Sequence, residues 1–176
     1  MHSQTIKSRS GIIKSERSGA TKDSTAAKKC LTFPVAYCIV LNMNINELGG
    51  RKRRYVDLAR RIAQQSTYGN VKHGAVLIKG GSVLNVACNK ENHCGFGNRF
   101  RERSTGHATL HAELGCVLNL DRSVTNGAEV FVVRVNRKGE YRMSKPCPMC
   151  QSALEHVGIN KVYYSTSNNT LETMRL

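Results

Sequence analysis

The sequence lacks tryptophan and is poor in acidic residues. It has 176 residues, of which 6% are aromatic and 40% hydrophobic, which is enough for one modest core and too few for two. Only 12 Asp and Glu oppose 27 Lys and Arg, which leaves a net charge of +15. This balance excludes an acidic, calcium-buffer-like protein. It favours polyanionic partners, namely nucleic acid, nucleotides or an anionic membrane face.

The sequence also lacks a long hydrophobic segment and a secretory signal with a cleavage site. Its apolar run Leu31–Met43 is interrupted by Pro34 and is shorter than the ~20 residues that span a bilayer. We therefore predict no membrane partner and an intracellular protein, most simply cytoplasmic, with a nuclear or organellar location as the alternative. Seven cysteines in a reducing compartment suggest metal or redox chemistry before disulfides.

Just over half of the excess charge lies in the first third of the chain. Residues 1–54 contain 11 Lys and Arg against 3 Asp and Glu, and the first 29 of them have no apolar period. We predict that residues 1–54 form a basic, disordered extension and that residues 55–176 form the folded domain. A targeting segment is an alternative for the extension. The basic tetrad Arg51–Arg54 is either a polyanion or nuclear-import patch or the solvated approach to a helix.

Regular patterning begins at Tyr55. Apolar residues at i, i+3, i+4 and i+7 predict a first helix, and Gly80-Gly81 between two apolar runs predicts a β-hairpin over 75–87. The following segment, 89–107, is predicted to be a long polar loop. After it we expect a helix over 110–120, a strand over 130–135, a helix over 148–157, a strand over 161–165 and an edge strand over 170–176. This order predicts an α/β sandwich around one mixed sheet.

Two short segments carry the chemistry-bearing residues, HAE at 111–113 and PCPMC at 146–150. Cys147 and Cys150 lie at i and i+3, so both sulfurs can reach one metal ion about 2.3 Å away. With His111 as the third ligand, the set suits Zn²⁺ and leaves the fourth position open, as in catalytic zinc sites. Glu113 points away from direct ligation but can take up and return a proton. A second CxxC, which would complete a closed site of four cysteine ligands, is absent.

These two segments resemble the signature of the zinc-dependent cytidine/deoxycytidylate deaminase superfamily, HxE followed by PCxxC. The similarity runs from about Tyr55 to the C-terminus and includes HGAVLIKGG and GINKVYYST. The resemblance implies a three-layer, cytidine-deaminase-like sandwich. In that fold helices cover both faces of a mixed central sheet of about five strands.

The resemblance also implies roles for individual residues. His111, Cys147 and Cys150 would bind zinc, while Glu113 would shuttle protons as water replaces the exocyclic amine of the base. Two further residues are expected at the substrate. The Ala112 backbone N–H would lie near the base, and Asn89 would contact the base or the ribose.

Two features bear on the substrate. Residues 166–176 are too few for a crossover to a parallel last strand, so this strand should return antiparallel, as in the deaminases of free cytidine and unlike those of polynucleotides. Basic side chains in the 89–107 loop favour a phosphate-bearing substrate, and we predict that they contact it; they are Arg99, Arg101 and Arg103.

We therefore predict zinc-dependent hydrolytic deamination of a cytosine-type base in a nucleoside or nucleotide, such as cytidine, deoxycytidine or dCMP, to the uracil product and ammonia. One alternative is a deaminase of cytosine or adenosine within RNA or single-stranded DNA. Another is a catalytically silent, zinc-stabilised module that binds nucleic acid. The sequence leaves open the exact substrate, a homo-oligomer, and a second zinc site near Cys88, His93 and Cys94.

Overall fold

The computed structural model describes residues 42–69, 71–102 and 108–176. Its strands are β1 (Met43–Asn44), β2 (Lys72–Lys79), β3 (Ser82–Cys88), β4 (Lys90–His93), β5 (Thr109–Leu110), β6 (Glu129–Val135), β7 (Tyr141–Arg142), β8 (Lys161–Ser165) and β9 (Thr170–Arg175). Its helices are the 3-10 turn η1 (Ile45–Glu47) and α1 (Gly50–Gln64), α2 (Gly95–Asn98), α3 (Ala112–Val117), α4 (Arg122–Thr125) and α5 (Pro148–His156). Among these described helices, none is long and apolar enough to cross a membrane.

One mixed sheet organises this part of the chain. Its strand order is β1-β9-β8-β6-β2-β3, with β7 paired to β6; β6 and β8 are parallel, and the other neighbours run antiparallel. Five strands have between five and eight residues, whereas β1 and β7 have two each. The predicted sheet of about five strands is therefore confirmed, with two short additions. The last strand returns antiparallel as predicted, with Leu171 opposite Ser165.

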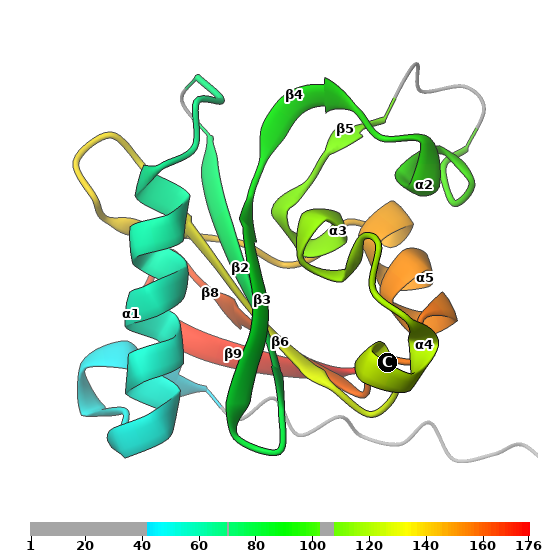
Figure 1. Ribbon diagram of the computed structural model, residues 1–176. Helices are drawn as coiled ribbons and strands as arrows, with labels where there is room; N and C mark the ends of the chain where they lie inside the picture. The colour runs from blue at the N-terminus through cyan, green and yellow to red at the C-terminus, as the bar shows by residue number, and fades with distance from the viewer. Residues whose placement is uncertain (1–41, 70, 103–107) are drawn as a thin grey trace, which may run out of the picture. The chain divides into compact units, whose positions relative to one another are not determined.

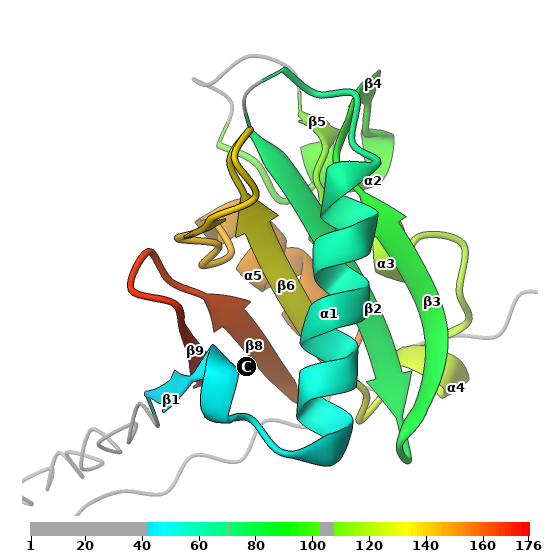
Figure 2. The same ribbon diagram turned by 90° about the vertical axis from the view of Figure 1, so that its left-hand side faces the viewer.

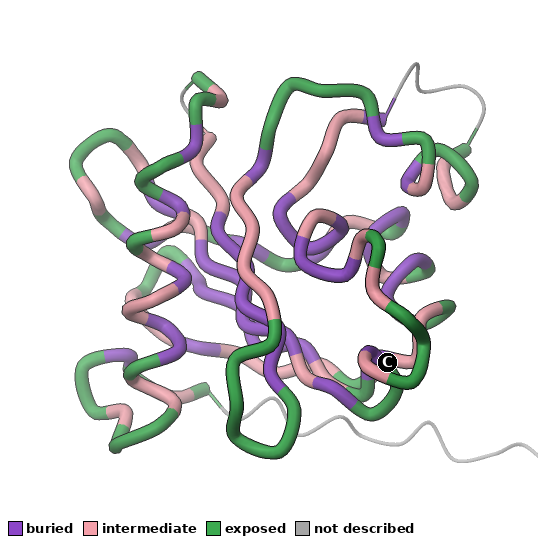
Figure 3. The backbone as a smooth tube through the Cα atoms, viewed as in Figure 1, coloured by how far each residue is buried: buried purple, intermediate pink, exposed green. Residues whose placement is uncertain are grey.

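Helices cover both faces of the sheet, α1 on one face and α3 and α5 on the other (Figures 1 and 2). Successive strand residues point to opposite faces, so each strand serves two cores. Val76 and Val133 pack with the buried side of α1, while their neighbours Leu77 and Val132 pack with α3 and α5. Figure 3 shows the buried residues concentrated in the central strands and the inner sides of the helices. This arrangement is the three-layer sandwich that we predicted.

Two glycines account for the local path of the β2–β3 hairpin. Gly80 and Gly81 have φ of +59° and +86°, which only glycine adopts freely and which a tight turn between these strands requires. Gly74 serves packing instead, because a Cβ at this position would overlap the backbone of Ala59 and Ala63 in α1. Helix and sheet therefore approach more closely here than any side chain on β2 would permit.

The domain boundary predicted at Tyr55 falls inside α1, which begins at Gly50. The chain joins the sheet still earlier, since Met43 in β1 pairs with Leu171, and Ile45 is fully buried against the α1 side of the core. The sequence pattern did not predict this early start, because residues 51–54 are all charged and show no apolar period. Lys and Arg nevertheless favour a helix, so α1 continues through them. The rest of the predicted extension, 1–41, lies outside the described residues and stays a prediction.

The polar segment 89–107 is more regular than the loop we predicted. It contains β4, which pairs with β5, and the short helix α2, whose first turn is capped by the Cys94 sulfur. The helix predicted over 110–120 is shorter, because the backbone becomes extended at Leu118 and ends α3 at Val117. Asn119 follows with a φ of +62°, and Asp121 caps the separate helix α4. Residues 103–107 lie outside the described part of the chain.

Candidate active site

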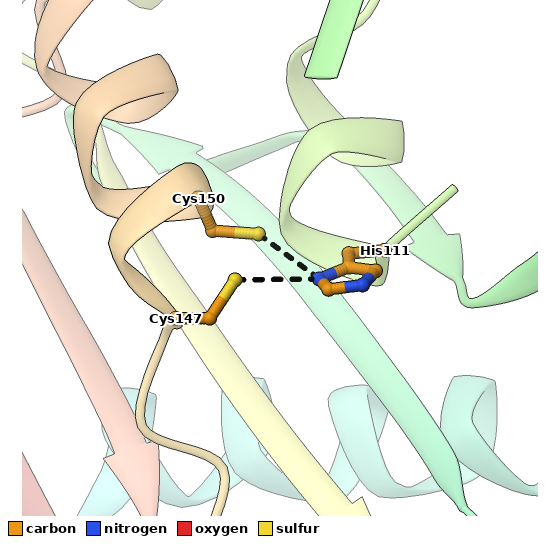
Figure 4. Close-up of side chains that lie close together, drawn as sticks. All are labelled: His111, Cys147 and Cys150. Atoms are coloured by element: carbon orange, nitrogen blue, oxygen red, sulfur yellow. Dashed lines mark hydrogen bonds between the residues drawn. The ribbon is translucent and has the colours of Figure 1, made fainter. Parts of the chain in front are cut away.

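The sequence-predicted metal ligands lie at the starts of two helices on the same face of the sheet. His111 is the residue before α3, Cys147 is the residue before α5, and Cys150 is in the first turn of α5. Pro148 occupies the first position of α5, where its missing N–H is not needed and its fixed φ suits a helix. The three side chains point toward one another from their two helices (Figure 4). Residues distant in sequence are thus brought into one cluster.

The spacing of this cluster fits a tetrahedral metal. His111 Nδ1 lies 3.2 Å from Cys150 Sγ and 3.7 Å from Cys147 Sγ, and all three atoms lie within 4.8 Å of one another. Zn–S and Zn–N bonds of about 2.3 and 2.05 Å at tetrahedral angles place nitrogen and sulfur about 3.6 Å apart. The donor set of two sulfurs and one nitrogen also suits zinc. Among the described residues, no other group of this kind converges.

The ligand side chains influence one another's protonation. The neighbouring Cys150 thiol, and then His111, lower the pKa of Cys147 to about 4. The hydrogen bond with Cys147 raises the pKa of His111 above its usual 6.5, whereas the bond to Cys147 and burial both raise the pKa of Cys150. The cluster therefore holds one thiolate ready for a metal, and binding of the metal would release the remaining protons.

Glu113 lies in the first turn of α3, two residues beyond His111, and only 5% of it is exposed. Burial raises the pKa of its carboxyl group above the usual 4.5, and the charge of His111 opposes this only in part. A carboxyl group with a raised pKa holds a proton more readily than an ordinary one, which suits a group that must both accept and donate a proton. Its environment therefore suits proton transfer rather than a surface ion pair.

A cavity of about 320 Å³ joins the carboxyl group to the cluster. It is lined by Tyr68, Val71, His73, Asn89, Thr109, His111, Ala112, Glu113, Lys145 and Cys147. A second cavity of about 530 Å³ shares four of these residues, including His111 and Cys147, and adds Arg101. The cluster therefore lies between two adjoining cavities that share lining residues, and the inner one has a size typical of small-molecule sites.

Residues 49–166 match a protein family described as the cytidine and deoxycytidylate deaminase zinc-binding region. The chain belongs to this family. No curated protein matches the sequence.

Three solved structures are similar to this chain at a TM-score of 0.42. The apo dCMP deaminase of the cyanophage S-TIM5 is 26% identical over 64% of this chain and 80% of that one. The same cyanophage enzyme in complex with dCMP and dUMP is 24% identical over 64% and 79%. RibD of Acinetobacter baumannii is 16% identical over 65% of this chain and 27% of that one.

In this deaminase-family site, Asn89 is held by its own neighbours. Its side-chain oxygen accepts hydrogen bonds from Ser66 Oγ at 2.7 Å and from the His73 backbone N–H at 2.8 Å, and its amide nitrogen donates to the Val71 carbonyl at 2.7 Å. One amide hydrogen remains for a ligand. Asn89 therefore fixes the wall of the inner cavity, while Ala112 contributes to that wall at the first position of α3.

The three arginines predicted to contact substrate differ in their location relative to the candidate site. Arg101 lines the outer cavity beside His111 and Cys147. Arg99 is exposed at the end of α2 and lines neither of these two cavities, and Arg103 lies outside the described residues. The residues considered for a second zinc site, Cys88, His93 and Cys94, do not converge into such a group among the described residues. The Cys94 sulfur instead accepts the Gly97 N–H at 3.3 Å and caps α2.

The fold adds five cavity residues that the sequence did not single out: Tyr68, Val71, His73, Thr109 and Lys145. Burial lowers the pKa of His73 to about 4, helped by the charge of Arg134, so its imidazole is neutral at physiological pH. Lys145 immediately precedes the PCPMC segment and is exposed. The position of a cationic side chain beside the metal-ligand segment could have suggested Lys145 from sequence, whereas the other four residues come from scattered positions.

Proposed function

We propose that this protein is a zinc-dependent hydrolase that removes the exocyclic amino group of a cytosine-type base in a nucleoside or nucleotide. One water is consumed, ammonia is released, and the base becomes its uracil counterpart. The observation that carries this proposal is the shared cavity, in which His111, Cys147 and the buried Glu113 carboxyl face one volume of about 320 Å³. A purely structural zinc site would need the ligands but neither the carboxyl group nor the cavity.

His111, Cys147 and Cys150 would hold the metal, which supplies a Lewis acid that makes water a good nucleophile near neutral pH. Glu113 does the proton chemistry. Its carboxylate accepts a proton from the attacking water and passes it to the ring nitrogen next to the amino-bearing carbon. The proton of the new hydroxyl group then passes through the same carboxylate to the amino nitrogen, so that nitrogen leaves as ammonia and the hydroxyl oxygen becomes the carbonyl. The raised pKa of Glu113 makes the second half of this transfer easier, because a less acidic carboxyl group is easily reprotonated.

The walls of the inner cavity would orient the base. The Ala112 backbone N–H at the start of α3 and the remaining amide hydrogen of Asn89 are donors for a carbonyl or hydroxyl oxygen of the substrate. Neutral His73 presents a flat ring on the same wall. These groups supply directional contacts in an otherwise small cavity, which suits a single pyrimidine base.

A phosphate on the substrate would be met by two basic side chains. Lys145 lines the inner cavity and has no hydrogen bond or ion pair within the described part of the chain, while Arg101 lines the adjoining outer cavity. Both cavities meet at His111 and Cys147, and Glu102 also lines the outer one. A nucleotide whose base lies near Glu113 would place its phosphate near two cations opposed by one carboxylate. This favours a nucleotide over an uncharged nucleoside.

An ammonia-release screen tests the proposal. The substrates are cytosine, cytidine, deoxycytidine, deoxycytidylate, guanine, single-stranded DNA and RNA, with zinc quantified in the same preparations. We expect release from a mononucleoside or mononucleotide of cytosine, and its loss in Glu113→Ala with zinc retained. Release from guanine or from polynucleotides alone would contradict the proposed substrate. No release from any of them by zinc-loaded protein would favour the binding-module alternative.

A further inference from the structure

The basic tetrad at the start of α1 divides into two pairs with different tasks. Lys52 lies 5.2 Å from the centre of the Tyr163 ring. Arg53 binds the Ile45 carbonyl at 2.8 Å and the Asp57 carboxylate at 3.1 Å. These two side chains thus hold the N-terminal segment onto the domain. Arg51 and Arg54 are exposed and take part in no such contact, which leaves their charge available.

Arg51 and Arg54 line a cavity of about 910 Å³, together with Arg61 from the later part of α1 and the residues of the β2–β3 turn, Gly80–Val83. Within residues 42–69, 71–102 and 108–176, none of the three guanidinium groups has a hydrogen-bond or ion-pair partner. The acid in the lining, Asp57, is already bound to Arg53. A fourth arginine in the lining, Arg60, donates a hydrogen bond to the Gly139 carbonyl but has no acidic partner among the described residues. The cavity therefore contains four positive charges without an acidic partner, three of them on guanidinium groups that make no hydrogen bond in the described part of the chain.

This cavity is separate from the candidate active site. It shares no lining residue with the inner catalytic cavity, and α1 covers the face of the sheet opposite to α3 and α5 (Figure 2). A ligand here would not reach Glu113 through the sheet, because the strands between are packed with fully buried residues on both faces. The phosphate of a substrate bound near Glu113 therefore cannot contact these arginines.

We propose that this arginine-lined cavity binds the phosphate backbone of a single-stranded nucleic acid. Arg51 and Arg61 are ten residues apart, which is about 15 Å along a helix, so the row of charges exceeds the reach of one phosphate group. Guanidinium groups match phosphate oxygens with paired hydrogen bonds. A hollow between a helix and a turn admits one strand, whereas a duplex would meet only its rim.

The binding would be independent of sequence. The aromatic residue in the lining, Tyr55, is buried and donates its hydroxyl to the Gly81 carbonyl, so it offers no face on which a base could stack. Contacts through phosphate alone position a strand without reading its bases. Retention of a strand on one face of the sheet would concentrate the enzyme on nucleic acid without making that nucleic acid its substrate.

Fluorescence anisotropy of a labelled 20-nucleotide single strand, titrated with the full chain across a salt series, tests this proposal. The test variant is R51A/R54A/R61A. The matched control is K90A/R137A/K138A, which removes the same charge from exposed residues elsewhere. Loss of three phosphate contacts should lower the slope of log affinity against log salt by about 2, and affinity at 0.1 M salt roughly a hundredfold. Thermal unfolding of both variants checks that each is folded.

Equal losses in the test variant and the control would overturn the proposal, since they would reflect total charge alone. Displacement of the strand by an equal phosphate concentration of tripolyphosphate would overturn it in favour of a small-anion site. Tighter binding of the matching duplex would also overturn it. Because the test variant keeps the catalytic cavity, its release of ammonia from a small substrate should equal that of the unmodified protein, and that readout judges the proposed function independently.

Discussion

Replacement of Glu113 by glutamine isolates the proton-transfer role of this residue. The amide has nearly the same shape but cannot accept a proton at working pH, and general acid–base groups contribute about 10²- to 10⁴-fold to rate. We therefore expect kcat to fall by a factor in that range, roughly 3 to 5 kcal/mol in activation free energy. Zinc content should stay the same, because Glu113 is not one of the three residues whose ligand atoms converge.

The pH dependence of the deamination rate, measured for the unmodified protein and for Glu113→Gln, tests the same role of Glu113. Burial raises the pKa of Glu113 above 4.5, and the carboxylate form is the one that accepts the proton. The deamination rate of the unmodified protein should therefore fall as pH falls through this raised pKa. The variant should lose that acid limb.

The raised pKa of Glu113 also predicts how the stability of the fold depends on pH. A raised pKa means that the fold favours the neutral carboxyl group, so stability is lost as pH rises through that pKa. The metal-free Glu113→Gln variant should therefore be at least as stable at pH 7 as the metal-free unmodified protein. Activity of the variant within tenfold of that of the unmodified protein, with zinc bound, would refute the assignment of the proton shuttle to Glu113.

Three further changes have defined outcomes. Cys150→Ser should reduce bound zinc after dialysis, as measured by atomic emission, because it removes one of two sulfur ligands; full zinc content would contradict the ligand assignment. Lys145→Ala should raise KM about tenfold for deoxycytidylate and leave that for deoxycytidine unchanged, whereas equal changes would argue against a phosphate contact. Gly74→Ala should lower the free energy of unfolding in urea by about 1–3 kcal/mol, while Gly95→Ala, where a Cβ meets nothing within 4 Å, should change it little.

Those parts of the fold that depend on short-range pattern were predictable from sequence. The hairpin around Gly80-Gly81 and the alternating strand β6 follow local rules of turn chemistry and residue period. The convergence of His111 with Cys147 and Cys150 was also accessible, because helix starts fix where such side chains point and the two segments form a recognisable pair.

The parts that depend on tertiary contacts were not predictable. The early start of α1 relies on Ile45 reaching the core and on Arg53 holding its carbonyl, and no pattern within 42–54 signals either contact. The cavity wall likewise joins Tyr68, His73 and Lys145 from three separate segments. Asn89 was expected at the substrate, but only the fold shows that most of its hydrogen-bonding capacity is committed to Ser66, Val71 and His73.

The residues that precede α3 and α5 link metal content to local stability. At these positions a Ser, Asp or Asn would bond the free N–H groups of the first turn, a contact worth about 1 kcal/mol for each helix. His111 and Cys147 make no such bond. Both helices thus give up a capping residue for a metal ligand. The ion would act as a common cap that ties the two helix starts together, and removal of zinc should speed amide exchange there before the sheet is affected.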